Sequence, residues 1–310
     1  MDHKLITTQL NETKGLKTLQ DFMRWGASCF MQAELSFSHG MASAIDEAVY
    51  LSLRAVYLPV DTPEIYWQGR LTPIEKKRLI NFFTQRIIDR KPAAYITQEG
   101  WFAGLLFYID ERVLVPRSPI SELIENQFSP WIDPYTTSSI LDLCTGSACI
   151  GIACAYAFPD AEVDVVDISQ DALDVANINI QKHAMDERVF AIQSDLFSSL
   201  DGKIYDLIVT NPPYVDQEDI NALTQEFKHE PQLGLASGND GLDATRIILQ
   251  YAAQHLSSEG VLIVEVGNSQ YALSEAFPQI PFYWLEFQKG GEGVFVLTAQ
   301  QLEEYTTHLV

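Results

Sequence analysis

The chain has 310 residues, of which 47% are hydrophobic; its 20 Lys and Arg against 42 Asp and Glu give a net charge of −22. At about 150 residues per domain this length predicts two domains, and no run approaches the roughly 20 apolar residues of a membrane-spanning helix. The start of the chain resembles no signal peptide, and the four cysteines form no C-x-x-C pair, which favours a cytoplasmic protein with reduced thiols and no metal.

Residues 1–98 are predicted to form a small helical domain. Apolar residues recur at helical spacing in Leu16–Phe30, Ala42–Val56 and Pro73–Ile87. The third segment begins with Thr72 as a capping residue and a proline at the first helical position. Because no catalytic constellation occurs here, we interpret this domain as a packing or substrate-recognition unit.

Residues 99–118 change to an alternating pattern and predict a β-hairpin linker, with its turn at Asp110-Glu111. Residues 119–310 then alternate helices with apolar strands. The expected elements are helix 121–128, strand 140–143, helix 149–158, strand 162–166, helix 170–183, strands 189–193 and 205–210, helix 242–256 and strand 261–266.

This order indicates an α/β fold with a doubly wound, mostly parallel sheet covered by helices on both faces. The sequence around Gly290-Gly291 predicts a C-terminal antiparallel hairpin that closes the sheet.

Two candidate ligand-binding features occur at strand ends. The strand Ile140–Leu143 leads into the small residues Cys144–Ala148, which let a ligand approach the backbone at a helix N-terminus. Asp167 ends the next strand about 20 residues later, where an acidic side chain accepts hydrogen bonds from ribose hydroxyls. A nicotinamide dehydrogenase would show both features.

The third feature, Asn211-Pro212-Pro213-Tyr214, directly follows a strand. The two prolines fix the backbone and remove two N–H donors. What is left is a pair of acceptors, the Asn211 side-chain oxygen and the Pro212 carbonyl, beside the ring of Tyr214. This arrangement suits a planar NH2 group. The hypothesis of a dehydrogenase does not explain it.

These motifs resemble class I S-adenosylmethionine-dependent methyltransferases that carry N-P-P-Y, and specifically the protein N5-glutamine methyltransferases. The segments Val115–Glu122, His229–Gly238 and Glu265–Ser269 are similar to the branch that methylates a glutamine of large-subunit ribosomal protein L-three. The release-factor branch usually reads R-P-D-T-E, where this chain has Arg117-Ser-Pro-Ile-Ser-Glu.

The resemblance implies the site residues and the cofactor. The methionine part of S-adenosylmethionine would lie along Asp142, Cys144, Thr145, Gly146, Ser147 and Ala148, and its nucleoside along Asp167, Ile168, Asp195 and Leu196. Asn211 would also contact the cofactor. Asn211, Pro212, Pro213 and Tyr214 would hold the substrate amide, with Asn211, Pro212 and Tyr214 as the catalytic residues. The family loop is commonly G-T-G-S-G, so Cys144 and Ala148 replace two glycines, while Gly146 can still adopt a positive φ.

The leading hypothesis is therefore N5-methylation of a glutamine in a basic ribosomal protein, either free or in an early assembly particle. A release factor is the alternative substrate. A nucleic-acid adenine or guanine N-methyltransferase also carries N-P-P-Y, but the negative charge disfavours nucleic-acid binding and favours a basic protein. A non-catalytic protein with the same fold would have no need of these intact motifs.

Overall fold

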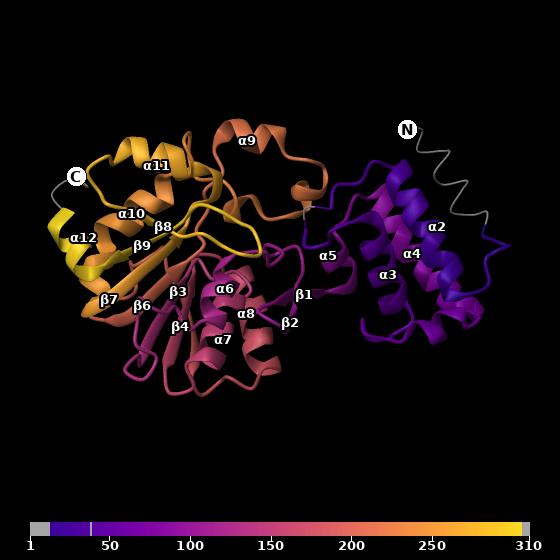
Figure 1. Ribbon diagram of the computed structural model, residues 1–310, viewed down its shortest axis with the longest axis horizontal. Coiled ribbons are helices and arrows are strands. Elements are labelled where there is room, and N and C mark those ends of the chain that lie inside the picture. Colours follow the sequence, from indigo (N-terminus) through magenta and orange to yellow (C-terminus); the bar gives the residue numbers. More distant parts are fainter. Residues whose placement is uncertain (1–12, 38, 306–310) are drawn as a thin grey trace. The chain divides into compact units, whose positions relative to one another are not determined.

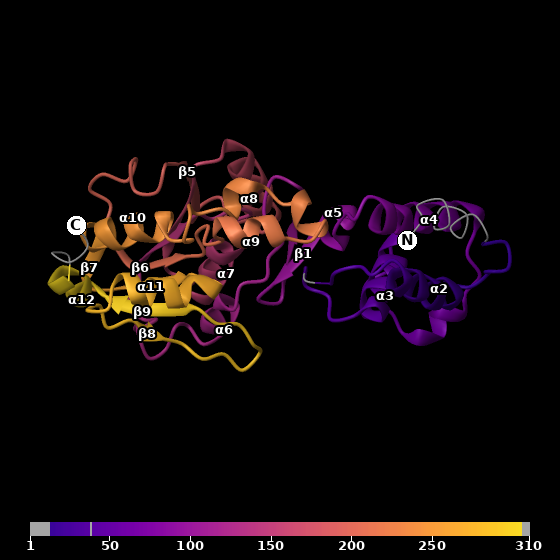
Figure 2. The ribbon, with the colours of Figure 1, turned by 90° about the horizontal axis from the view of Figure 1, so that it is seen from above.

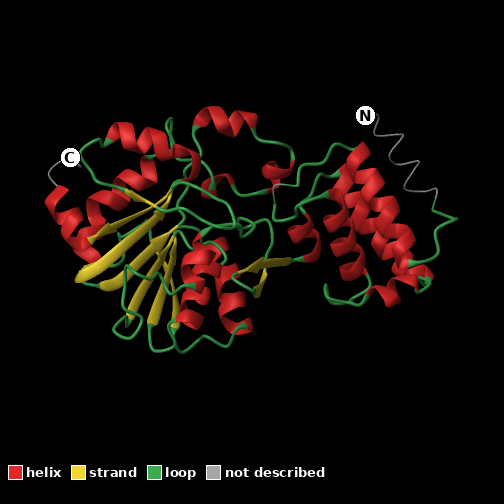
Figure 3. Ribbon diagram, viewed as in Figure 1, coloured by secondary structure: helices red, strands yellow, loops and turns green. Residues whose placement is uncertain are grey.

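The computed structural model describes residues 13–37 and 39–305 and divides into two compact units. One contains Met1–Glu99 and Thr224–His229, and the other contains Gly100–Leu223 and Glu230–Val310. The first is helical, and the second is built around a sheet (Figure 3). The segment Thr224–His229 is a difference from the predicted boundaries, since the sequence pattern assigned it to the second domain.

The helical unit contains α2 (Leu19–Gln32), α3 (Ala44–Ala55), the 3-10 turn η1 (Glu64–Gln68), α4 (Pro73–Ile88) and α5 (Ala93–Thr97). The side chains of Thr18, Ser43 and Thr72 cap the three long helices. Thr72 forms a capping box with Glu75, which confirms the predicted start of α4. The apolar faces of α2, α3 and α4 enclose a core that includes Phe22, Phe30, Leu51 and Phe83.

A buried ion cluster crosses this core. The guanidinium of Arg86, 1% exposed, donates to the carboxylates of Glu47 and Glu226 and to the carbonyl of Ser36. Glu226 belongs to Thr224–His229 and also accepts hydrogen bonds from the Ser36 N–H and from Arg90. A charge cluster therefore joins a segment from late in the chain to α3 and α4.

A separate hairpin consists of β1 (Glu99–Phe102) and β2 (Leu105–Tyr108), and all of it except Glu99 belongs to the second unit. The hairpin was predicted, but its turn was misplaced, because the chain reverses at Ala103-Gly104 and not at Asp110-Glu111. Ala103 and Gly104 both have positive φ, at 47° and 75°, which suits a two-residue hairpin turn. Asp110 instead accepts hydrogen bonds from Arg112.

The main sheet has seven strands in the order β5-β4-β3-β6-β7-β9-β8. They are β3 (Ser139–Leu143), β4 (Glu162–Asp167), β5 (Val189–Gln193), β6 (Tyr205–Thr210), β7 (Leu256–Glu265), β8 (Tyr283–Trp284) and β9 (Val294–Thr298). The first five run parallel, and β9 is antiparallel to both of its neighbours. This arrangement confirms the predicted parallel sheet with antiparallel C-terminal strands and shows that β9 is inserted between β7 and β8.

Helices cover both faces of this sheet, with α6, α7 and α8 on one side and α10, α11 and α12 on the other (Figure 1). The view from above separates the same two groups (Figure 2). The α-helices of this unit, including α9 from the segment after β6, are α6 (Ile120–Glu125), α7 (Cys149–Ala157), α8 (Gln170–Lys182), α9 (Gln217–Ala222), α10 (Asp243–Tyr251), α11 (Gln270–Ala276) and α12 (Ala299–Tyr305). Because β6 and β4 lie on opposite sides of β3, the strand order reverses at β3, where such sheets bind ligands beyond the carboxyl ends of their strands.

Within residues 13–37 and 39–305, no helix has both the length and the apolar character needed to cross a bilayer. No group of three or more His, Cys, Asp and Glu side chains in the same ranges is placed to hold a metal ion.

The buried ion cluster gives a stability prediction. We expect Arg86→Met to lower the free energy of unfolding by about 3–5 kcal/mol, because it leaves the buried carboxylates of Glu47 and Glu226 without their main cation. Chemical denaturation followed by circular dichroism measures the change. The matched control is Arg24→Met on the exposed face of α2; equal stability of the two variants would contradict a structural role for the cluster.

Candidate active site

The loop Cys144–Ala148 joins β3 to α7, and every second residue in it has a positive φ. Cys144, Gly146 and Ala148 all have positive φ, at 60°, 56° and 62°. Glycine is the residue that adopts this conformation without strain. The two positions where the family loop commonly has glycine are therefore left-handed in this chain as well, although Cys and Ala occupy them, so the departure from G-T-G-S-G changes the residues but not the turn.

Asp142 shapes this loop from beneath. Its carboxylate is fully buried and accepts hydrogen bonds from the Thr145 hydroxyl and, at 2.8 Å, from the Gly151 N–H. The other carboxylate oxygen has no hydrogen-bond partner among the described residues. Burial raises the pKa of Asp142 to about 7. Asp142 lines neither of the two cavities described below. Its carboxylate therefore supports the loop from the protein interior.

Asp167 connects the loop to the end of β4. One carboxylate oxygen accepts the Gly146 N–H at 2.9 Å and the other accepts the Ser169 N–H at 2.9 Å. Burial raises the pKa of Asp167 above its ordinary value. The carboxylate lies at the wall of a cavity and keeps lone pairs for a ligand, so it both fixes the loop and faces the site.

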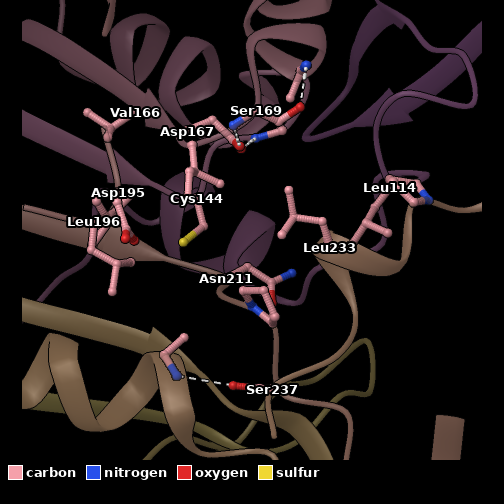
Figure 4. A pocket seen from close by; sticks show the side chains of 18 of the residues that line it. Leu114, Cys144, Val166, Asp167, Ser169, Asp195, Leu196, Asn211, Leu233 and Ser237 are labelled. Carbon is pink, nitrogen blue, oxygen red and sulfur yellow. Dashed lines mark hydrogen bonds between the residues drawn. The ribbon is translucent and has the colours of Figure 1, made fainter. Parts of the chain in front are cut away.

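A cavity of about 290 Å³ opens at the carboxyl ends of β3, β4 and β6. Figure 4 shows Asp167 and Ser169 on one side of it, Asp195 and Leu196 on another, and Cys144 and Asn211 between these and Leu233. Ile168 and Gly146 also line it. The sequence-predicted residues of the cofactor nucleoside thus meet at one cavity, close to the lower end of the usual size for a small-molecule site.

Several lining residues of this cavity were not predicted. They include Leu114, Leu233, Ser237, Ala244 and Ile247. Four of them come from the long segment after N-P-P-Y and from α10, where apolar side chains look like ordinary core residues in the sequence. Only the tertiary fold brings them to the strand ends.

The N-P-P-Y segment leaves β6 and lies between two cavities. Asn211 lines both of them, and its side chain makes no hydrogen bond with any described residue. Pro213 lines the larger cavity and Tyr214 lines a smaller one of about 80 Å³, whereas Pro212 is buried and lines neither. A polar amide at the junction of two cavities, without a protein partner in the described chain, is available to a ligand.

Tyr214 is fixed by the segment Glu265–Ser269. Its carbonyl accepts the Ser269 hydroxyl at 2.7 Å, and its own hydroxyl donates to Glu265 at 3.4 Å. Gly267 lies so close to the ring that an added Cβ would sit 2.7 Å from it. The Glu265–Ser269 motif noted in the sequence therefore sets the position of the N-P-P-Y tyrosine.

The smaller cavity is also bordered by Val115–Ser118, Thr145, Gly146, Ser147 and Glu265. Arg117 makes a two-pronged ion pair with the buried carboxylate of Glu230, at 2.5 and 2.8 Å. Ser118 donates to Glu265 at 2.5 Å. Ala148, like Asp142, lines neither cavity. Glu265 was not predicted as a site residue, although it ends an apolar strand as Asp167 does.

Comparison with known proteins shows the family of the chain. Residues 123–242 match the methyltransferase small domain family. The chain is 52% identical to the ribosomal protein uL3 glutamine methyltransferase of Francisella tularensis over 94% of this chain and 93% of that protein. It is 48% identical to the enzyme of the same name from Neisseria gonorrhoeae, covering 93% of this chain and 96% of that protein.

A solved structure shares the fold at much lower identity. The hMettl16 catalytic domain, solved in complex with an RNA hairpin, has a TM-score of 0.50 and 14% identity over 73% of this chain and 81% of that one. Such a likeness supports the methyltransferase fold alone. The near-complete match to the two curated enzymes goes further, and this chain belongs to the ribosomal protein uL3 glutamine methyltransferase family.

Proposed function

We propose that this protein transfers a methyl group from S-adenosylmethionine to the side-chain amide nitrogen of a glutamine in ribosomal protein uL3. The observation that carries the proposal is the position of Asn211. Its side chain borders both the cavity of about 290 Å³ and the smaller one of about 80 Å³, and it has no hydrogen-bond partner among the described residues. The two uL3-modifying relatives support the substrate.

We propose that the larger cavity holds the cofactor. Asp167 and Asp195 provide carboxylates, and the Asp195 side chain accepts no hydrogen bond from a described residue. Leu196 and Ile168 provide apolar walls for an adenine ring. At Gly146 an added Cβ would meet no protein atom within 4 Å, so the backbone there is open to a ligand. When bound, S-adenosylmethionine supplies a methyl group already activated by its sulfonium.

The protein's own contribution is alignment and charge stabilisation. An amide nitrogen is a weak nucleophile because its lone pair is delocalised into the carbonyl. The Asn211 side-chain oxygen would hold one N–H and favour the positive charge that grows on nitrogen. Tyr214, held by Ser269, would flank the amide and exclude water. Holding the two reactants in one orientation is itself a large part of such a rate enhancement.

The charge distribution supports a basic protein substrate. The helical unit has 13 Lys and Arg against 12 Asp and Glu, whereas the sheet-containing unit has seven against 30. Nearly all of the negative charge thus belongs to the unit that contains the cavities. We propose that this field attracts uL3 in the cytoplasm before rRNA covers it, and that the helical unit adds recognition.

The first test concerns the cofactor. We expect Asp167→Ala to weaken S-adenosylmethionine binding at least tenfold, because it removes a ligand acceptor and both hydrogen bonds that fix Gly146 and Ser169. Calorimetric titration measures the affinity. Asp171→Ala, on the exposed start of α8, is the control; an affinity equal to that of this control would exclude Asp167 from the cofactor site.

The second test concerns the amide. Asn211→Ala should lower the rate of methyl transfer by about 10²–10³-fold while leaving the protein folded, since a preorganised group at the site of developing charge is lost. Single-turnover assays with radiolabelled cofactor give the rate, and a melting curve reports folding. Asn221→Ala on the exposed face of α9 serves as the control. A folded Asn211→Ala enzyme with most of its turnover would refute the assignment.

The third test concerns the substrate. Free uL3 should be methylated in preference to release factors and to mature large subunits, in a side-by-side assay with mass spectrometry of the glutamine. Its kcat/KM should fall as salt rises, because screening shortens to about 8 Å at physiological ionic strength. Preferential methylation of release factors would show that the substrate is a release factor and not uL3. Equal methylation of mature large subunits would contradict the requirement for free uL3.

A further inference from the structure

The smaller cavity contains one carboxylate that the mechanism above does not use. Glu265 ends β7 and is 5% exposed. It borders the cavity together with Asn211 and Tyr214. A buried acid at the wall of this small cavity has a desolvation cost, and the fold keeps it there although an apolar residue would avoid that cost.

Both oxygens of this carboxylate are held in place. Ser118 donates to one at 2.5 Å, and Ser118 itself accepts the Ile120 N–H at 3.1 Å. The Tyr214 hydroxyl donates to the other at 3.4 Å. Since a carboxylate oxygen accepts two hydrogen bonds, each retains a lone pair after these contacts. Glu265 is therefore oriented by protein groups and still able to accept from a ligand.

The smaller cavity brings one carboxylate together with the residue predicted to hold the amide. Asn211 can accept one N–H of the amide, and the Pro212 carbonyl stays the predicted second acceptor. Among the side chains that border the smaller cavity, Glu265 is the one carboxylate, and it borders this cavity together with Asn211.

We propose, building on the glutamine methylation proposed above, that Glu265 is a catalytic residue that accepts the proton leaving the substrate amide nitrogen. As the nitrogen lone pair forms the N–C bond, the S–C bond of the sulfonium donor breaks and its electron pair goes to sulfur. One N–H bond of the methylated amide then breaks, its pair stays on nitrogen, and the proton binds a Glu265 oxygen. The neutral product leaves, and Glu265 returns the proton to solvent.

The electrostatic surroundings suit this role. Burial raises the pKa of Glu265 to about 7, which is the range in which a general base operates best near neutral pH. The Arg117 guanidinium opposes this shift, but its charge is shared with Glu230. The Tyr214 hydroxyl, whose pKa is raised by burial, stays protonated and continues to donate. No other charged side chain of the described residues is hydrogen-bonded to Glu265.

Two measurements on Glu265→Gln separate proton transfer from a structural role. With free uL3 and saturating cofactor, wild-type kcat should rise as pH passes upward through about 7 and then level off, whereas the variant should be about 10²-fold slower without this rise. Asp142, whose pKa is also raised and which supports the cofactor loop, is unchanged in the variant, so a rise that persists in Glu265→Gln would be assigned to Asp142. Glu259→Gln, exposed on the same strand, should keep the wild-type profile.

The second measurement is the melting temperature. Folding raises the pKa of Glu265, so the folded state favours the protonated acid and loses stability as pH rises from the ordinary carboxyl value to about 7. Glu265→Gln should therefore melt at a higher temperature than wild type at pH 8 and at a similar temperature at pH 5. A carboxylate needed only for structure would give the opposite result at pH 8.

These outcomes decide the proposal. A variant that keeps the pH-dependent rise and most of its turnover would overturn it, as would loss of activity accompanied by a lower melting temperature at pH 8. If wild type methylates release factors in place of uL3, the same pH series on the release factor tests Glu265, and only the substrate assignment fails.

Discussion

The hydrogen bond from the Gly146 N–H to the Asp167 carboxylate is the contact on which the rest of the site depends. It joins the loop after β3 to the end of β4, next to the bond from the Thr145 N–H to the Val166 carbonyl at 2.9 Å. Parallel pairing of Leu143 with Val166 places the carboxyl ends of β3 and β4 side by side. The left-handed turns of the loop can then be held without glycine at Cys144 and Ala148, because the neighbouring strand fixes the backbone between them.

The same chain places acids in its interior at several strand ends and loops. Asp142, Glu230 and Glu265 are each less than 6% exposed. Glu230 is neutralised by Arg117, but Asp142 and Glu265 face hydroxyl and N–H donors without an adjacent unshared cation. Their raised pKa values show what this costs the folded state. Acids that reduce stability yet border or support the cavities are more readily explained by function than by packing.

Much of the fold could be predicted from local patterns. Strands β5 and β6 occupy the predicted residues, since short, mostly apolar runs bounded by polar residues are typical of strands. The hairpin turn was misplaced because Asp110-Glu111 looks like a turn, whereas Ala103 has an unusual positive φ that only the pairing of β1 with β2 imposes. The place of Thr224–His229 in the helical unit was also hidden, because it depends on Glu226 meeting Arg86 at a separation of 140 residues.

The candidate site also has residues that could be predicted from the sequence and residues that could not. Asp167 and Asn211 follow from the rule that ligands bind where parallel strands end, and the rule applied to β7 also selects Glu265. The role of the segments that suggested the substrate branch could not be predicted in this way, because it depends on tertiary contacts. These contacts join Arg117 to Glu230, Ser118 to Glu265, and Ser269 to Tyr214. One or both partners of each contact, namely Arg117, Ser118, Glu265 and Tyr214, line the smaller cavity. Under the proposed function, the branch motifs act on how the amide is held, and the acidic field of the catalytic unit acts over longer distances on the protein that carries it.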